Sequence, residues 1–126
     1  MTTAIILFAH GARDPEWAGP LRRVQAAIRQ QAGEVPVELA FLEFMAPTLP
    51  ECAAALVAGG AENILVVPMF IAQGGHLKRD VPEMLARLRS THPQARFSLS
   101  GAIGEEAVVI RAMADAALKL AGSEFA

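Results

Sequence analysis

The sequence has little of the chemistry that cross-links a chain or gathers metal ions through sulfur. Cys52 is the one cysteine among 126 residues. It allows no disulfide within the chain and no zinc or iron–sulfur site built from several cysteines. A metal ion bound by this chain must therefore be held through nitrogen or oxygen ligands.

Charge of one sign and long hydrophobic runs are also missing. The formal net charge is −2 and the sequence pI is about 5.9, so no overall positive field favours nucleic acid as a partner. The apolar runs are far shorter than the ~20 residues that a membrane-spanning helix needs, and no membrane partner is expected. Residues 4–9 are apolar and follow no basic leader or secretory cleavage site, so we expect a cytoplasmic protein.

The composition is that of a folded domain. With 53% hydrophobic and 19% charged residues, the chain is too apolar to be disordered. Its length is typical of one domain, and we predict a single domain over residues 1–126. Residues 122–126 are interpreted as a disordered tail or a cloning remnant, and no function is assigned to them.

Short apolar runs alternate with longer segments of helical period. The four runs predicted to be strands are residues 4–9, 37–42, 63–68 and 96–100. Such alternation is typical of a parallel sheet with helices on both faces, and the common strand order 2-1-3-4 makes the first three strands neighbours. We therefore predict an α/β fold with a single four-stranded parallel sheet, similar to half of a flavodoxin-like fold.

Capping residues mark the expected helix starts. Asp14, followed by Pro15, is predicted to cap the first helix. Capping boxes are predicted at residues 48–51 for the second helix and at residues 80–83 for the third. A fourth helix is expected near the C-terminus, with one apolar stripe that contains Val109, Ala112, Met113, Ala116 and Leu120.

Three side chains that bind metals follow the first three predicted strands. His10 follows the first strand, Glu43 the second and His76 the third. Ligands of open parallel sheets bind beyond the carboxyl ends of the strands, so these three side chains are candidates to converge on one cleft. Each alone has an ordinary explanation, as a hydrogen-bonded histidine or a solvated turn carboxylate. Together, two imidazoles and a carboxylate suit a divalent first-row metal ion without selecting one.

Residues beside the two histidines suggest a large anionic ligand. Gly74 and Gly75 let the backbone approach a flat ligand closely, although ordinary turn chemistry also explains them. Arg13 and Arg79 border the same place and are candidates to pair with carboxylates of the ligand. The apolar segment 68–72 is either a bed for a flat ligand or part of the core.

In their order along the chain, these motifs resemble those of a known family. They are H-G-A-R-D-P at residues 10–15, F-L-E at 41–43, P-M-F-I at 68–71, G-G-H at 74–76 and D-V-P at 80–82. This set is similar to that of the small single-domain sirohydrochlorin chelatases (CbiX type) of the class II chelatase superfamily. The resemblance extends from residue 3 to about residue 120, and it implies a chelatase-like fold and a homodimer.

The resemblance also implies a reaction. The family inserts Co²⁺ or Fe²⁺, and in some members Ni²⁺, into sirohydrochlorin for cobalamin or sirohaem biosynthesis, without ATP. A tetrapyrrole is then the substrate, and no cofactor is needed beyond the metal that is inserted. The motif histidines correspond to His10 and His76, and the motif glutamate corresponds to Glu43. The histidine-rich tail or loop of some small members is missing here, which argues against nickel handling more than against chelation.

Two questions stay open at this point. The sequence does not separate metal binding from removal of pyrrole protons among His10, His76 and Glu43. A non-catalytic carrier of metal or tetrapyrrole on the same fold is the alternative function. A histidine phosphatase is disfavoured because Ala9 stands where its motif requires arginine, and no phosphate-binding glycine motif for a nucleotide occurs.

Overall fold

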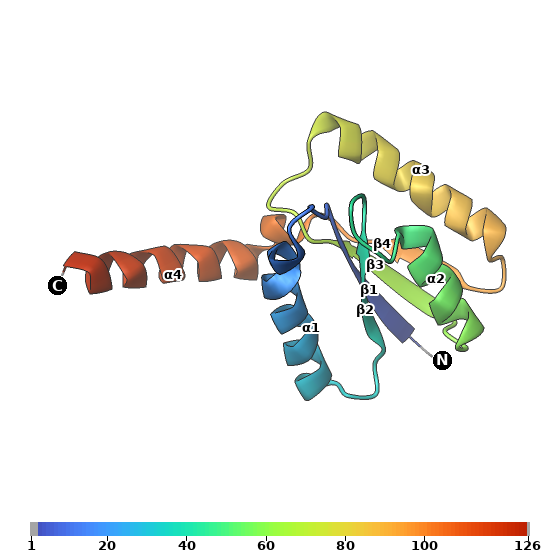
Figure 1. The fold of residues 1–126 in the computed structure, drawn as a ribbon, viewed down its shortest axis with the longest axis horizontal. Coiled ribbons are helices and arrows are strands. Elements are labelled where there is room, and N and C mark those ends of the chain that lie inside the picture. The colour runs from blue at the N-terminus through green and yellow to red at the C-terminus, as the bar shows by residue number, and fades with distance from the viewer. Residues whose placement is uncertain (1–2, 126) are drawn as a thin grey trace.

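The computed structural model describes residues 3–125, which form a four-stranded parallel sheet with the order β2-β1-β3-β4 (Figure 1). The strands are β1 (Thr3–Ala9), β2 (Val37–Phe41), β3 (Asn63–Pro68) and β4 (Arg96–Leu99). The predicted α/β class and strand order are confirmed. All four strands lie within one residue of their predicted bounds.

Three of the four α-helices cover the sheet. They are α1 (Gly19–Gln31), α2 (Leu49–Ala58) and α3 (Gly75–Thr91), and the fourth is α4 (Ala107–Phe125). Two short 3-10 helices, η1 (Pro15–Ala18) and η2 (Ile103–Glu105), precede α1 and α4. Helix α1 packs on one face of the sheet, while α2 and α3 pack on the other, so the prediction of helices on both faces is confirmed.

The side chains of β1 alternate between two apolar cores. Ile6 and Phe8 belong to the cluster beneath α2 and α3, and Leu7 and Ala9 belong to the cluster beneath α1. Because successive side chains of a strand point to opposite faces, a central strand covered on both sides must be apolar throughout. This explains the continuous apolar run at the start of the sequence.

The helix starts agree only in part with the predicted caps. Thr48 and Glu51 form the predicted capping box: the Thr48 N–H donates to Glu51 Oε1 at 2.8 Å, and the Glu51 N–H donates to Thr48 Oγ1 at 3.3 Å. Asp14 accepts from the Glu16 N–H at 3.0 Å, but it caps η1, because α1 proper begins at Gly19.

The capping box predicted at residues 80–83 is wrong. Helix α3 begins at Gly75, and Lys78 already donates its N–H to the Gly74 carbonyl at 3.1 Å, so Asp80 lies inside the helix. Pro82 is also internal to α3. A proline inside a helix removes one backbone hydrogen bond, and here the packing of Val81 and Leu85 in the core favours the helix.

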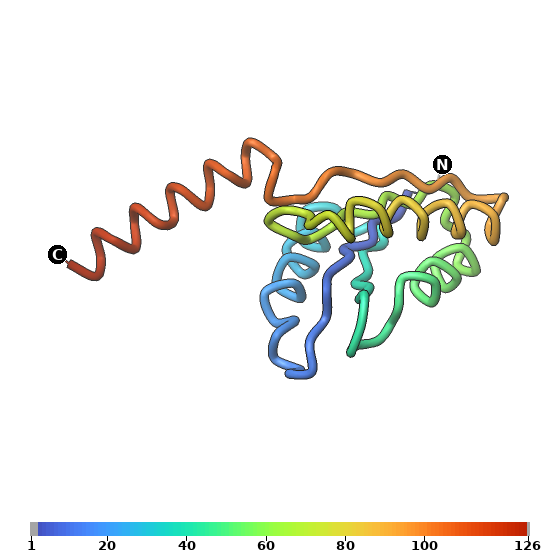
Figure 2. Tube along the Cα trace, turned by 90° about the horizontal axis from the view of Figure 1, so that it is seen from above, coloured from blue at the N-terminus to red at the C-terminus, as the bar shows by residue number. Residues whose placement is uncertain are grey.

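Helix α4 stands away from the rest of the molecule (Figures 1 and 2). The predicted helix is present, but none of its described side chains is buried, and η2 is the element that it contacts most. The tail interpreted as disordered or as a cloning remnant is helical as far as Phe125, and Ala126 lies outside the described residues. Within residues 3–125, no helix has the length and apolar character to span a membrane.

Candidate functional site

Backbone pairing beyond the ends of β1 and β2 brings His10 and Glu43 together. The Leu42 N–H donates to the Ala9 carbonyl at 2.8 Å, and the Glu43 N–H donates to the His10 carbonyl at 3.0 Å. Gly11 follows with a φ of 86°. A Cβ atom at this position would overlap the Glu43 carbonyl oxygen, so only glycine lets the two segments approach this closely.

The side chain of His10 is exposed but rests on an aromatic support. Its ring lies 4.9 Å from the ring of Phe70, centroid to centroid, with an interplanar angle of 48°. Phe70 is buried and packs edge-on against Phe8 at 6.2 Å. Phe70 therefore fixes the place of the His10 ring. This role was not predicted, because an apolar residue after a strand is usually part of the core.

His76 lies in the first turn of α3 and is exposed. It was predicted to follow the third strand, and the structure places it beyond that strand, inside the helix that starts at Gly75. Arg79 lies three residues further along α3, on the same side of the helix as His76, and is also exposed. Neither Gly74 nor Gly75 has a left-handed φ, and a Cβ atom added at either would meet open space. The two glycines therefore leave open space beside His76, and neither is needed for a left-handed turn.

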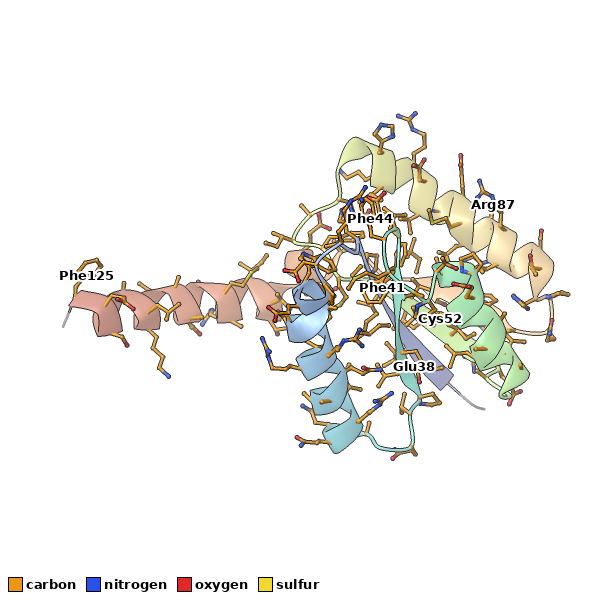
Figure 3. All side chains as sticks on the ribbon, in the orientation of Figure 1. Glu38, Phe41, Phe44, Cys52, Arg87 and Phe125 are labelled. Atoms are coloured by element: carbon orange, nitrogen blue, oxygen red, sulfur yellow. The ribbon has the colours of Figure 1, made fainter. Side chains whose placement is uncertain are left out.

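An apolar rim borders this end of the sheet. Phe44 follows Glu43 with a φ of 68° and is 56% exposed, and the guanidinium of Arg13 lies 4.6 Å above the centre of its ring. Figure 3 shows Phe44 at the edge from which these loops leave the strands. Ile71 is 74% exposed, so the segment 68–72 is divided: Phe70 belongs to the core and Ile71 is available to a ligand. No motif of the sequence indicated a role for Phe44.

The exposed side chains do not form a finished metal site. Among the residues that the structure describes, no group of three or more histidine, cysteine, aspartate or glutamate side chains is placed to hold a metal ion. His10, Glu43 and His76 follow three adjacent strands, since β1 lies between β2 and β3. The fold therefore places the three residues at one edge of the sheet, without a ready-made three-ligand cage.

Two other groups that can bind metals or react lie elsewhere. Cys52 is buried on α2, as predicted for a core residue, and burial, followed by the nearby carboxylate of Glu38, raises the pKa of its thiol to about 11. His92 ends α3, with its ring 6.1 Å from that of Phe97. Neither residue belongs to the edge that carries His10.

The fold is an open α/β fold, and the candidate residues lie beyond the carboxyl ends of its strands. Comparison with known proteins gives the particular family. The chain belongs to the CbiX family, whose family model, described as CbiX, matches residues 4–120.

Individual relatives agree with this assignment. The chain is 37% identical over 82 residues to a sirohydrochlorin cobaltochelatase of Methanococcus aeolicus, a match that covers 65% of this chain and 57% of the relative. The crystal structure of a CbiX protein from Marinobacter aquaeolei VT8 superposes with a TM-score of 0.82 at 28% identity, covering 96% of this chain and 98% of that one.

A third relative has been solved with a metal. The sirohydrochlorin chelatase SirB from Bacillus subtilis subspecies spizizenii, in complex with cobalt, has a TM-score of 0.71 at 32% identity, covering 82% of this chain and 44% of that one. This chain spans little more than half the length of the first curated relatives that it matches.

Proposed function

We propose that this protein is a sirohydrochlorin chelatase that inserts a divalent metal ion, Co²⁺ or Fe²⁺ and in a lesser role Ni²⁺, into the tetrapyrrole without ATP. The observation that carries the proposal is the placement of His10, Glu43 and His76 beyond three adjacent strand ends in a chain of the CbiX family. The names of its relatives, and the cobalt bound to one of them, support the choice of substrate and metal. The product would serve cobalamin or sirohaem biosynthesis.

The reaction requires groups that accept protons more than it requires a protein site that binds the metal ion tightly. The incoming ion replaces two pyrrole N–H protons, so two protons must leave the macrocycle for each ion inserted. Neutral imidazoles of His10 and His76 can either hold the ion or accept these protons, and Glu43 can complete the coordination or take a proton. An ion on its way into the macrocycle must be released again, and a closed site with three or four protein ligands would compete with the four pyrrole nitrogens.

The substrate is broad, flat and anionic, and the edge of the sheet offers matching surfaces. The exposed side chain of Ile71 and the open space beside Gly74 and Gly75 provide room for one face of the ring. Arg13 and Arg79 are proposed to pair with peripheral carboxylates, because a guanidinium binds a carboxylate through two parallel hydrogen bonds. The stacking of Arg13 on Phe44 holds its charge near the site.

Two further expectations belong to this proposal. The chain is proposed to act as a homodimer, because a single four-stranded domain encloses little of so broad a ligand and a second copy can wall the cleft. A cytoplasmic location is part of the same proposal.

The test follows metal insertion by the change in tetrapyrrole absorbance. Sirohydrochlorin is mixed with Co²⁺, Fe²⁺ or Ni²⁺ and a trace of protein, either wild type, His10→Ala or His76→Ala. We expect turnover above the spontaneous rate in the wild type and a fall of about 100-fold or more in each variant, in the range that acid–base groups contribute. His92→Ala is the matched control, since it removes the third histidine from the far end of α3 and should leave the rate unchanged.

The same assay separates the enzyme from a carrier. A carrier would bind metal or tetrapyrrole at equal molar amounts but would match the blank when present in trace amounts. If wild type and variants all match the blank with every metal, the catalytic proposal is wrong and the carrier function replaces it.

A further inference from the structure

Phe44 combines two features that each cost free energy. Its φ of 68° lies in the left-handed region, which is uncommon for residues other than glycine and asparagine. Its aromatic side chain is also 56% exposed to water. A bulky residue keeps such a conformation only where the surrounding structure fixes it, and residues of this kind cluster at ligand sites. The fold therefore holds an aromatic ring in water, in a strained conformation, directly after Glu43.

The loop that carries Phe44 is anchored on both sides of it. The Phe41 N–H donates to the Pro47 carbonyl at 2.9 Å and closes the base of the loop. The Glu43 N–H donates to the His10 carbonyl at 3.0 Å and ties the residue before Phe44 to the loop after β1. Because these hydrogen bonds fix the backbone around Phe44, its ring projects from a rigid support.

Arg13 covers one face of this ring. The carbon at the centre of its guanidinium lies 4.6 Å from the centre of the Phe44 ring, within the range of about 6 Å for a cation–π contact. The guanidinium occupies one face, so the exposed surface of the ring belongs to its edge and its other face. Within residues 3–125, no carboxylate forms an ion pair with Arg13, which is itself exposed. Its planar set of N–H donors is therefore free for a carboxylate from outside the chain.

We propose that Phe44 and Arg13 act together as the specificity-determining pair of this site. The free surface of the Phe44 ring stacks on the conjugated macrocycle, while Arg13, held against the same ring, pairs with one carboxylate of the macrocycle. A flat ring without carboxylates gains only the first contact, and a flexible polyanion gains only the second. The inference rests on the proposed function, because it takes a tetrapyrrole as the ligand of this edge.

A purely structural role for Phe44 predicts a different result on substitution. An aromatic residue that serves the fold loses stability when it is replaced. Asparagine accepts a left-handed φ more readily than phenylalanine does, so Phe44→Asn relieves the strain and keeps the loop in place. We therefore expect the urea midpoint of Phe44→Asn to equal or exceed that of the wild type, while its binding of the tetrapyrrole is weaker.

Equilibrium dialysis with sirohydrochlorin, without any metal ion, measures the binding step alone. Phe44→Asn should raise the dissociation constant about 10-fold, the loss expected for one stacked ring. Phe44→Trp keeps an aromatic face and should stay within about 3-fold of the wild type. The matched control is Phe125→Asn, which removes an exposed aromatic side chain from the far end of α4 and should leave the dissociation constant unchanged.

A double-mutant cycle tests whether the two residues act as a pair. Arg13→Gln should also raise the dissociation constant about 10-fold, because it removes a charged hydrogen-bond donor. The double variant should lose about 30-fold rather than about 100-fold, since the ring that holds the guanidinium is already absent in Phe44→Asn. Added salt should weaken binding by the wild type and by Phe44→Asn more than binding by Arg13→Gln, because salt screens the ion pair and not the stacking.

The absorbance assay separates binding from chemistry. Phe44→Asn should raise KM about 10-fold and keep kcat within about 3-fold, because the ring touches no reacting atom.

The inference is overturned if Phe44→Asn binds sirohydrochlorin as the wild type does, if Phe44→Trp binds as weakly as Phe44→Asn, or if the urea midpoint of Phe44→Asn falls along with its affinity. Each of these results leaves the chelatase reaction intact when the wild type turns over. Binding that depends on Phe44 without turnover refutes the reaction and supports the inference, whereas a wild type that does not bind sirohydrochlorin overturns both.

Discussion

The approach of the His10 loop to the Glu43 loop depends on the missing side chain of Gly11. We predict that Gly11→Ala destabilises the fold and stops metal insertion, although residue 11 carries no functional group. The new Cβ atom would overlap the carbonyl oxygen of Glu43, which is backbone and cannot rotate away. The two loops must separate, and His10 must leave its place on Phe70.

The size of the effect follows from comparison with a second glycine. Gly60 also has a left-handed φ, of 98°, but a Cβ atom there meets no heavy atom within 4 Å. Gly60→Ala should therefore cost only the backbone strain, about 1 kcal/mol. Gly11→Ala carries the same strain and also loses the hydrogen bond from Glu43 to His10 and the fit of the loops, for a total of about 3 kcal/mol.

Urea unfolding and turnover measure the two consequences separately. If the free energy of unfolding falls by about 2 kcal/mol per molar urea, the midpoint of urea unfolding should fall by about 1.5 M for Gly11→Ala and by about 0.5 M for Gly60→Ala. Turnover should be lost in the first variant and kept in the second. Equal midpoints for the two variants, with full activity in Gly11→Ala, would refute the contact on which the site geometry rests.

Three further predictions concern single residues. Thr48→Ala should cost about 1 kcal/mol in urea unfolding by removing a helix cap. The same variant should flatten the acid limb of stability only in part: the backbone N–H of residue 48, the larger cause of the lowered pKa of Glu51, remains, and only the smaller contribution of the Thr48 side chain is lost. This carboxylate stabilises the fold above pH 4.5 and ceases to do so as the pH falls through its lowered pKa. Cys52, whose thiol pKa is raised to about 11, should resist alkylation at pH 8 in the native protein and react fully in urea, as counted by mass spectrometry. Phe70→Leu should lower the free energy of unfolding by about 1–2 kcal/mol and should lower turnover, because Phe70 supports the His10 ring. Leu88→Ala, at an equally buried position away from His10, should cost more stability but less turnover.

The strands were predictable because burial on both faces leaves little choice of residue. In β1 and β3 the sequence must be apolar at nearly every position, and the run of β1 ends at His10. The positions of His10 and Glu43 followed from the strands, since each residue comes just after a strand and the order of parallel strands is strongly restricted. His76 lies further from its strand, in the first turn of α3. Their motifs added the family, which the CbiX match confirms.

The missed features depend on contacts between distant segments. No capping residue near Gly75 marks the start of α3. Residues 80–83 have the sequence of a capping box although they lie inside the helix, and this sequence led to the wrong start. The support of His10 by Phe70 and the stacking of Arg13 on Phe44 join loops that follow different strands. The apolar stripe of α4 was visible in the sequence, but a stripe does not say which surface covers it.

Helix α4 leaves an isolated copy with apolar side chains in water. In the proposed homodimer, folding stability becomes subject to mass action: the melting temperature should rise with protein concentration, as it does when a partner binds only the native state. Dilution would then lower the stability of the fold, because it favours dissociation of the pair. Rates measured with a trace of enzyme should fall below proportionality once the concentration drops under the dissociation constant of the pair.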